Sequence, residues 1–379
     1  MKVWVIQPGI APYRIPLFTK VDEYEDIDLT VVLLCEKVPF QPWDIDRSKL
    51  PFKTVMAEGI NIVVKDDRVV HDREVQFSFP LIPMLIRERP DVVVCSGFMF
   101  STLLVYMVSR IIGTRYVIWN EGTKYTDHDL PKIKYFLRKL MAKAASNFII
   151  AGSLAKEYVE SLIPNRNKEY FLSCNCIDDK HFSIDVNNEK FIKLKERLPE
   201  RYLLYVGRFI ESKGIKEMME VYREVVNADE YSDVGLVLLG EGRMQGHIEE
   251  YSQEHGLSNV FVEGFVEQVI IPYYYSAASS FVLLTLSDCN PLVVFEAMAS
   301  GVPIICSYRA GNASDFIVDG DNGYRVDPYE QDDVVSKIKM VLTEVDREKA
   351  GSVSQVLLEK ANYDVSAGAF VDAIKSAAK

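Results

Sequence analysis

The sequence predicts two α/β domains, each built on a doubly wound parallel sheet, and three observations lead to this fold class. The chain has 379 residues, which is about 2.5 times a typical domain of roughly 150 residues. Apolar residues make up 48% and charged residues 26%, the ordinary balance of a globular protein. Short Val-, Ile- and Leu-rich runs alternate with stretches of helical periodicity, the pattern of buried parallel strands joined by helices.

The expected strands form two series along the chain. The first half gives five of them: KVWVIQP at the start, then LTVVLLC, VVVCSG, RYVIWN and NFIIAGS. The second half repeats the pattern with YLLYVGR, VGLVLLGEG, NVFVEGF, SSFVLLT and VPIICS. The intervals between these runs leave room for helices, so each series predicts its own sheet.

A polar stretch rich in Asn and Asp, at about residues 175–195, lacks apolar periodicity and marks the boundary between the domains. We therefore expect a first domain over residues 1–177 and a second over 178–362. The remaining segment, 363–379, has an amphipathic helical pattern. This last helix could pack on either domain, and a return to the first domain is one of the two possibilities.

The charge of the chain is unevenly divided. The net charge is −12; residues 1–177 carry 23 basic and 21 acidic side chains, and residues 178–379 carry 20 and 34. A general nucleic-acid binder is basic overall, so no nucleic-acid partner is expected. The first half is the one suited to an anionic surface.

The six cysteines include no Cys-x-x-Cys pair, so neither a disulfide framework nor a zinc site is expected, and a reducing compartment fits best. The N-terminus contains a six-residue apolar strand rather than a secretory signal. Two uncharged runs, 92–109 and 269–287, approach membrane-spanning length. Gly, Ser or Pro interrupts both, and they are interpreted as strand–turn–helix units.

Polar residues follow the first strand of the second series. Gly207, Arg208 and Lys213 lie between that strand and the next helical pattern. Ligands bind beyond the carboxyl ends of parallel strands, and a glycine followed by a helix start suits an anion. The alternative interpretation is a solvated loop with two surface charges.

A second candidate segment follows SSFVLLT. Two carboxylates, Asp288 and Glu296, bracket a tight turn through Cys289, Asn290, Pro291 and Leu292, whose peptide N–H groups suit an oxyanion. Glu296 lies in an otherwise apolar helix, where a charge is costly unless it has a partner. A structural acid that caps a neighbouring loop is the alternative.

These two segments resemble the family 4 retaining glycosyltransferases, which have the GT-B fold. SDCNPLVVFEAMASGVPIICS resembles the family's donor-sugar motif, an acid and, after seven residues, a second acid that holds the nucleotide ribose. Glu296 matches the second acid, and Asp288 stands where the family usually has Glu. GRFIESKG resembles the loop whose Arg and Lys bind the donor diphosphate. NCIDDKHF resembles the interdomain Asn-Gly-Ile-Asp segment, with Cys176 in place of Gly.

The resemblance implies GT-B architecture, with two Rossmann-like domains facing across a cleft, and a metal-independent hexosyltransferase. Gly9 occupies the loop where the family usually has Gly-Gly near the sugar phosphate. Arg14 follows as a contact to acceptor or phosphate, or as a packed loop residue. Many relatives carry a His after the fourth or fifth strand of this domain, whereas this chain offers Glu121 as a catalytic candidate. A loop-stabilising acid is the alternative for Glu121.

Two alternatives to this function stay open. Gly240, Gly242 and Gly246 follow a strand and nearly match a dinucleotide fingerprint, which would indicate an NAD-dependent oxidoreductase. A catalytically inert nucleotide-sugar-binding protein would share every donor residue. Acid-x-acid pairs at Asp44/Asp46, Asp127/Asp129 and Asp319/Asp321 do not directly follow apolar strands and are interpreted as turns, so no metal is expected.

The expected activity transfers a sugar, from a UDP-sugar in preference to a GDP-sugar, to a saccharide or lipid-linked acceptor in polysaccharide or glycolipid assembly. The expected location is cytoplasmic. Residues 131–145 predict a helix with five cations and no acid, which favours a peripheral contact with the anionic inner face of the plasma membrane. The alternative is an ordinary core-packed helix with a solvated basic face. Its apolar face comprises Ile133, Phe136, Leu137, Leu140, Met141 and Ala144. Its basic face comprises Lys132, Lys134, Arg138, Lys139 and Lys143.

Overall fold

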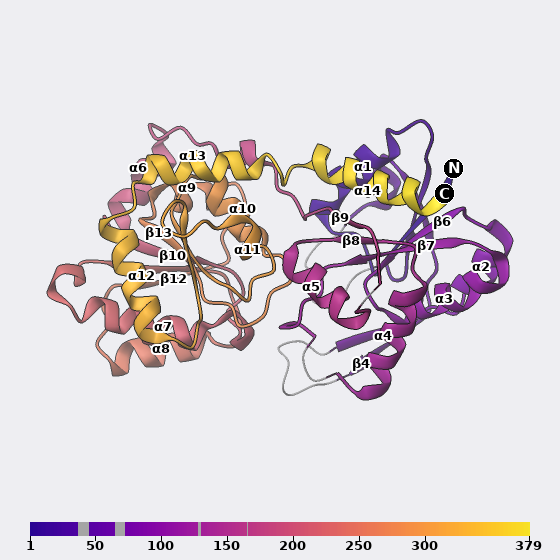
Figure 1. Ribbon diagram of the computed structural model, residues 1–379. Coiled ribbons are helices and arrows are strands. Elements are labelled where there is room, and N and C mark those ends of the chain that lie inside the picture. Colours follow the sequence, from indigo (N-terminus) through magenta and orange to yellow (C-terminus); the bar gives the residue numbers. More distant parts are fainter. Residues whose placement is uncertain (37–44, 65–72, 128–129, 165) are drawn as a thin grey trace. The chain divides into compact units, whose positions relative to one another are not determined.

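The computed structural model describes residues 1–36, 45–64, 73–127, 130–164 and 166–379. The chain divides into two compact units (Figure 1). Unit 1 contains Met1–Cys176 together with Ala361–Lys379, and unit 2 contains Ile177–Lys360. Unit 2 is therefore inserted, along the sequence, between the main part of unit 1 and its last segment.

Unit 1 is built on a seven-stranded parallel sheet of order β3-β2-β1-β6-β7-β8-β9. Consecutive strands diverge from β1, with β2 on one side and β6 on the other, so the sheet has a topological switch point between β1 and β6. The strands are β1 (Lys2–Gln7), β2 (Asp28–Leu33), β3 (Lys53–Met56), β6 (Val92–Ser96), β7 (Arg115–Asn120), β8 (Phe148–Ile150) and β9 (Tyr170–Leu172).

Each face of this sheet has its own apolar core, because alternate residues of a strand point to opposite faces. Val3 and Val5 of β1 belong to one core, and Trp4 and Ile6 belong to the other. The core of Trp4 is covered by α2 (Leu81–Glu88), α3 (Phe100–Ile112), α4 (Lys132–Ala144) and α5 (Ser153–Leu162). The core of Val3 is covered by α1 (Ile15–Asp22) and α14 (Tyr363–Ala378).

Helix α14, yellow in Figure 1, lies beside α1. Phe370 packs against Phe18 and Trp119, with its ring centroid 5.2 Å from that of the indole. Lys375 pairs with Asp26 at 2.7 Å. The segment after unit 2 thus completes a core made mostly of residues before unit 2.

Unit 2 has a six-stranded parallel sheet of order β12-β11-β10-β13-β14-β15, with its switch point between β10 and β13. The strands are β10 (Tyr202–Val206), β11 (Gly235–Leu239), β12 (Val260–Gly264), β13 (Ser280–Leu283), β14 (Ile304–Ser307) and β15 (Gly323–Val326). Contacts join α7 (Ile215–Val226) with α8 (Gln245–Glu254) and α12 (Gln331–Thr343). A second group joins α6 (Glu189–Arg197), α9 (Ile271–Ala277), α10 (Leu292–Ala299), α11 (Ala313–Phe316) and α13 (Arg347–Leu358).

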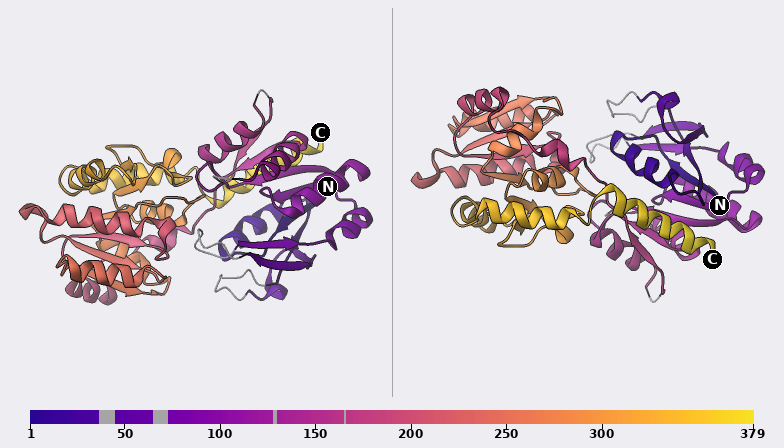
Figure 2. Two further views of the ribbon diagram at one scale, coloured as in Figure 1. Left: turned by 90° about the horizontal axis from the view of Figure 1, so that it is seen from below. Right: turned by 90° about the horizontal axis from the view of Figure 1, so that it is seen from above.

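The remaining elements are short. An antiparallel hairpin of β4 (Ile60–Val64) and β5 (Arg73–Phe77) lies outside the large sheets. Figure 2 gives two further views of these elements. The 3₁₀ turns are η1 (Pro12–Arg14), η2 (Arg47–Lys49), η3 (Asp179–Phe182), η4 (Glu211–Lys213) and η5 (Asp229–Tyr231).

All ten strands expected from the sequence are present, but one run has the opposite order of elements. Residues 92–109 contain a strand and then a helix, as expected, whereas 269–287 contain α9 and then β13. The reason is Pro272 near the start of α9, since proline fits the first turn of a helix and not a central strand. Within the described ranges, no helix combines the length and apolar character needed to span a bilayer.

Candidate functional site

The sequence-predicted polar residues of unit 2 lie at the carboxyl edge of its sheet, on both sides of the switch point. Gly207, Arg208 and Lys213 follow β10, and Asp288 follows the adjacent strand β13. In open α/β sheets, the loops after the two strands at the switch point run in opposite directions, and a crevice forms between them.

The loop after β10 is fastened to the segment that leads to Asp288. The hydroxyl of Thr285 and the backbone N–H of Leu286 both donate to the Ser212 carbonyl, at 2.9 Å. Gly214 has φ +71°, and a Cβ there would lie 1.9 Å from the Leu284 carbonyl oxygen. The GRFIESKG segment therefore ends in glycine because the backbone directly after β13 passes too close for a side chain.

Lys213 and Asp288 form an ion pair through Nζ and Oδ2. Their side chains are only 18% and 15% exposed, so this pair has less solvent screening than a surface salt bridge. Arg208 lies on the same loop, where its side chain is exposed but partly desolvated. This partial desolvation lowers the pKa of Arg208, and the nearby Asp288 carboxylate counteracts the shift. Two cations and a carboxylate thus meet at the strand ends.

The turn from Asp288 to Pro291 rests on the loop after β14. Gly311 N–H donates to the Asp288 carbonyl at 2.9 Å, and Asn312 Nδ2 donates to the Pro291 carbonyl at 3.0 Å. Pro291 has no N–H, so the predicted set of four peptide donors is wrong at that position. The helix that starts at Leu292 supplies first-turn N–H groups instead, because these have no intrahelical acceptor.

Glu296 lies one helical turn inside α10, and its carboxylate accepts a hydrogen bond from the buried Tyr275 hydroxyl at 3.0 Å. Burial raises the pKa of Glu296 to about 7, although the Tyr275 hydrogen bond and nearby His181 act to lower it. This acid does not cap a loop: it is held by one hydroxyl in a largely desolvated position.

The glycines that suggested a dinucleotide fingerprint have a different role here. Gly240 and Gly242 have φ +138° and +158°, and a Cβ on them would lie 1.9 Å from Gly207 O and 2.3 Å from Phe209 O. They therefore allow the backbone after β11 to pack against the loop that carries Arg208. Gly246 lies inside α8.

Unit 1 has a corresponding polar cluster at its own switch point. The Arg14 guanidinium donates to both Glu121 oxygens at 2.9 Å and to Gln7 Oε1. Gln7 in turn donates to Ser96 Oγ at 2.6 Å. Arg14 also lies over the Trp119 indole, 4.5 Å from its centroid. Gly9 is buried in the loop between β1 and this arginine.

Two residues complete this cluster and were not singled out from the sequence. Asn175 Nδ2 donates to Glu121 Oε1 at 2.9 Å, and Gln7 bridges Arg14 to Ser96. The available signal for Asn175 was its place in NCIDDKHF, and for Gln7 its place at the end of a buried strand. Glu121 is therefore fixed by two donors rather than free in a loop.

The acid-x-acid pairs have local structural partners. Asp46 caps η2 through Ser48 N, Asp127 pairs with Arg138, and Asp319 pairs with Arg325. Asp44, His128 and Asp129 lie outside the described residues. In the part of the chain that the structure describes, no group of three or more His, Cys, Asp or Glu side chains has an arrangement suited to a metal.

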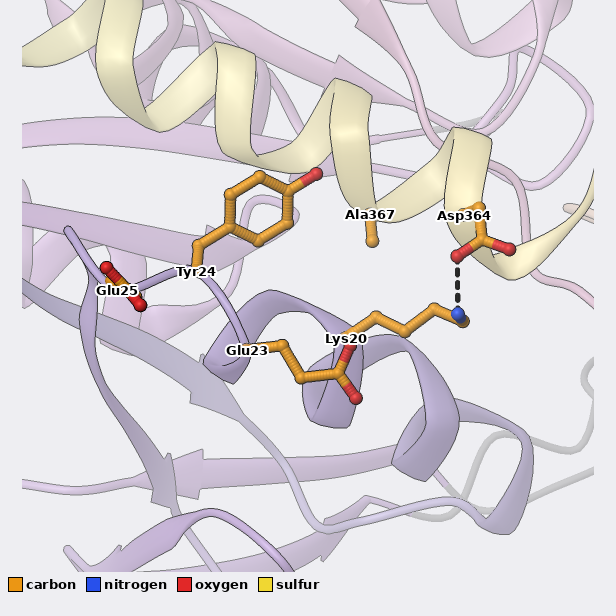
Figure 3. Close-up of a pocket in the computed structure, with 6 residues that line it drawn as sticks. All are labelled: Lys20, Glu23, Tyr24, Glu25, Asp364 and Ala367. Carbon is orange, nitrogen blue, oxygen red and sulfur yellow. Dashed lines mark hydrogen bonds and ion pairs between the residues drawn. The ribbon is translucent and has the colours of Figure 1, made fainter.

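One pocket of unit 1 lies beside α1 and α14 rather than at the strand ends (Figure 3). Lys20 reaches across it to Asp364, and its other lining residues are Glu23, Tyr24, Glu25 and Ala367. None of the candidate site residues lines it. The Lys20–Asp364 pair joins the two helices, so we interpret this pocket as part of their packing.

Helix α4 differs from its prediction in two side chains. Arg138 points inward and pairs with Asp127 at 2.6 Å, and it lies near the Phe98 and Tyr158 rings, so it does not belong to the basic outer face. Ala144, predicted to lie on the apolar face with Met141, is exposed, whereas Met141 is buried. The helix packs through Leu137, Arg138, Met141 and Ala142, which leaves Ile133 and Phe136 64% and 54% exposed.

Solved structures with this architecture identify the fold. The lipopolysaccharide outer core galactosyltransferase WaaB superimposes with a TM-score of 0.72 at 18% identity, covering 99% of both chains. The Anabaena protein HepE, in complex with UDP and glucose, gives 0.72 at 14% identity and covers 99% of this chain and 100% of its own. The two parallel-sheet units therefore have the GT-B fold of glycosyltransferases.

The sequence comparison then gives the family. Residues 186–353 match the family described as Glycosyl transferases group 1. The match confirms the resemblance carried by GRFIESKG and SDCNPLVVFEAMASG, both of which fall inside the matched residues.

Curated relatives are more distant. A sulfoquinovosyl transferase of Arabidopsis thaliana is 23% identical over 309 residues, which is 77% of this chain and 58% of the relative. A capsular polysaccharide biosynthesis glycosyltransferase of Staphylococcus aureus is 29% identical over 223 residues, 56% of this chain and 57% of the relative. The matches span between 43% and 58% of the length of the first four curated relatives.

Proposed function

We propose that the protein is a retaining glycosyltransferase that moves a sugar from a nucleoside diphosphate sugar to a hydroxyl group of a saccharide or lipid-linked acceptor. The observation that carries this proposal is the Lys213–Asp288 pair at the switch point of unit 2, with Arg208 on the same loop. Two cations suit a diphosphate, and a neighbouring carboxylate suits sugar hydroxyl groups.

The proposed chemistry follows from where charge develops. Breaking the bond between the sugar and the diphosphate leaves additional negative charge on the phosphate oxygens. Arg208 and Lys213 would stabilise that charge, which is the role of a divalent metal in other transferases, so we propose a reaction that requires no metal. Lys213 would exchange Asp288 for a phosphate oxygen when the donor binds, which leaves Asp288 available to the sugar.

The nucleoside part of the donor is assigned to α10. Glu296 would accept the ribose hydroxyl groups, and the N–H groups of the first turn of α10, which follows Cys289, Asn290 and Pro291, would meet the phosphate, because helix N-termini favour anions. We favour uridine as the base. Support comes from three structures of one protein of this fold, Anabaena HepE, in complex with UDP, with UDP and glucose, and with UDP-glucose.

Unit 1 is assigned to the acceptor. Glu121, fixed by Arg14 and Asn175, is the proposed group that meets the acceptor hydroxyl, and the Gly9 loop lies at the same switch point. Among the curated relatives are a capsular polysaccharide biosynthesis glycosyltransferase and a lipopolysaccharide 1,2-N-acetylglucosaminetransferase. These names support an acceptor in cell-surface polysaccharide or glycolipid assembly.

We also propose that unit 1 contacts an anionic membrane through helix α4. The first two turns of α4 expose Ile133 and Phe136 together with Lys132 and Lys134. Apolar side chains flanked by lysines suit the surface of an anionic bilayer. This arrangement supports cytoplasmic, peripheral placement at the inner face of the plasma membrane.

The first test measures how much UDP, GDP, ADP and NAD each stabilise the protein against thermal unfolding. A ligand at 100 times its Kd stabilises by about 2.7 kcal/mol, and we expect a clear rise in Tm with UDP. A rise with NAD and none with the diphosphates would instead support the oxidoreductase interpretation. Binding of UDP without transfer to any acceptor or to water would support the inert binding protein.

The second test is turnover of UDP-sugar by Arg208→Ala and Lys213→Ala, with Lys216→Ala as the matched control. Lys216 is an exposed lysine on the first turn of α7. Each site variant should lose about 10²-fold in kcat, a barrier increase of about 3 kcal/mol, whereas the control should retain its turnover. Full activity of the double variant would contradict the assignment.

A further inference from the structure

His181 lies where two parts of the proposed nucleotide site meet, although neither the catalytic nor the binding assignment above uses it. It belongs to η3, which packs on α10, the helix that carries Glu296. Its imidazole is close enough to Glu296 to act on the pKa of that carboxyl group. His181 therefore marks the side of α10 on which the proposed ribose contact lies.

The other side of the imidazole contacts the segment between β12 and α9, residues 265–270. His181 Nε2 lies 3.1 Å from the Gln268 carbonyl oxygen, which requires a proton on Nε2 for a hydrogen bond. This segment follows the carboxyl end of β12, and its side chains include Phe265, 74% exposed, and the exposed Val269. An exposed ring beside a strand end offers a flat apolar surface for a planar base.

Aromatic packing fixes the position of the imidazole. The His181 and Phe182 rings meet edge to face at 5.5 Å, and Phe182 meets Tyr275 in the same manner at 6.0 Å. Tyr275 is the residue whose hydroxyl donates to Glu296. A continuous series of contacts thus runs from Gln268 through His181, Phe182 and Tyr275 to Glu296.

We propose that His181 is a positioning residue for the nucleoside half of the donor. Its hydrogen bond to Gln268 would hold the 265–270 segment beside α10, so that the base and the ribose meet a surface that is already formed. The proposal rests on the proposed function, because it assumes that unit 2 binds a nucleoside diphosphate. It assigns His181 no contact with the reacting atoms.

The test compares two probes, UDP and pyrophosphate, by calorimetric titration of the full chain. In His181→Ala the Kd for UDP should rise about fivefold to tenfold, the scale of one lost hydrogen bond. The Kd for pyrophosphate should stay within about twofold, because pyrophosphate has no nucleoside part. In a UDP-sugar assay the donor KM should rise while kcat changes by less than about twofold.

Three comparison variants distinguish positioning from general structural damage. His181→Gln keeps an N–H donor and should restore UDP binding to within about twofold of the wild type. His255→Ala removes an exposed histidine directly after α8 and should leave both affinities unchanged. Lys213→Ala should weaken UDP and pyrophosphate together, which checks that both probes occupy the proposed phosphate site.

The proposal is overturned if His181→Ala binds UDP like the wild type while Lys213→Ala does not. It is also overturned if His181→Ala weakens both probes equally, because that result indicates a damaged unit 2. Failure of the wild type to bind UDP, GDP or ADP would overturn the proposed function itself. The same titration therefore separates the failure of one proposal from the failure of the other.

Discussion

Single residues determine how unit 2 presents charge to a ligand, and Glu296 is the clearest case. Its carboxyl group is desolvated, so its pKa is raised to about 7 in the ligand-free protein. A carboxylate is a stronger acceptor for ribose hydroxyl groups than a protonated acid. The ionisation of Glu296 should therefore be linked to donor binding.

The first prediction concerns the pH dependence of donor affinity. Below about pH 7 a proton must leave Glu296 before it can act as a charged acceptor, so the Kd for UDP should rise as the pH falls from 8 to 5.5. In Glu296→Gln affinity should be lower at pH 8 and much less dependent on pH. Calorimetric titration at several pH values measures both effects. An unchanged pH profile in the variant would show that another group is responsible.

The second prediction concerns the free energy of unfolding, which should depend on pH because the pKa of Glu296 is raised in the folded protein. The pKa of Glu296 is higher in the folded than in the unfolded chain, so its stabilising contribution is complete below about pH 4.5 and is lost as the pH rises through about 7. Glu296→Gln, which resembles the protonated acid, should raise the free energy of unfolding at pH 8 by up to the order of 3 kcal/mol. At pH 5 the effect should be small. Denaturant unfolding at both pH values tests this; equal stability at pH 8 would contradict it.

Asp288 gives the third prediction, because one methylene separates it from the family's usual Glu. Asp288→Asn removes the partner of Lys213 and the charge near the sugar, so kcat should fall more than donor affinity. Asp288→Glu should keep substantial turnover, since the longer side chain retains the carboxylate. Steady-state kinetics with a UDP-sugar separates kcat from KM. Unchanged turnover of Asp288→Asn would remove Asp288 from the catalytic residues.

At the scale of elements, helix α4 shows what periodicity can and cannot predict. A 3.6-residue period correctly placed Met141 toward the core and Lys132 and Lys134 toward solvent. It placed Arg138 on the wrong side, because the ion pair with Asp127 satisfies a side chain that periodicity treats only as polar. The partner of a buried charge lies elsewhere in the sequence, so no local pattern could indicate it.

The fourth prediction tests α4 as a membrane contact by co-sedimentation with anionic and neutral vesicles. Changing Lys132, Lys134 and Lys143 to Glu should abolish binding to anionic vesicles at low salt, since each cation contributes about 1 kcal/mol near the surface. The matched control changes Lys190, Lys193 and Lys195 on α6, which are also exposed, and should bind normally. Arg138 is left unchanged because of its ion pair. Equal binding of both variants would exclude this helix as the contact.

Elements that are very short, or in which polar and apolar residues are mixed, were the ones that the sequence did not reveal. The strands of the two main series were visible because strands buried on both faces are nearly continuous in Val, Ile and Leu. β9 is three residues long, and β15 reads GYRV, so neither has enough length to show a period. The β4–β5 hairpin alternates polar and apolar residues outside both main series.

At the scale of the whole molecule, the candidate site was predictable where motifs lie close together in sequence. GRFIESKG and SDCNPLVVFEAMASG carry their residues within a few positions of a strand end, and the structure places Lys213 against Asp288. The Gln7–Arg14–Glu121–Asn175 cluster joins three separate segments: the end of β1 with the turn after it, the loop after β7 and the loop after β9. Only the strand order of the sheet brings these segments together.

The fifth prediction concerns the core that α14 completes in unit 1. Phe370→Ala should lower the free energy of unfolding by about 3–5 kcal/mol, because it removes a ring packed against Phe18 and Trp119. Val356→Ala on α13 is the control, since this side chain is 61% exposed. Hydrogen exchange should show lost protection in β1, β2 and β7 in the first variant. Equal stability of the two variants would show that α14 is not part of this core.

The insertion of unit 2 also sets an order of events during synthesis. The strands of unit 1 are made first, but Phe370, Val371 and Ile374, which cover one face of their sheet, follow only after Ile177–Lys360 has been translated. At roughly 5–20 residues per second, that interval lasts about 10 to 40 seconds. During this time the nascent sheet exposes the apolar face around Trp119, whereas unit 2 emerges as one continuous segment that contains its whole core. A ribosome-bound chain of this protein is therefore expected to need chaperone protection for its earlier half and to fold its later half first.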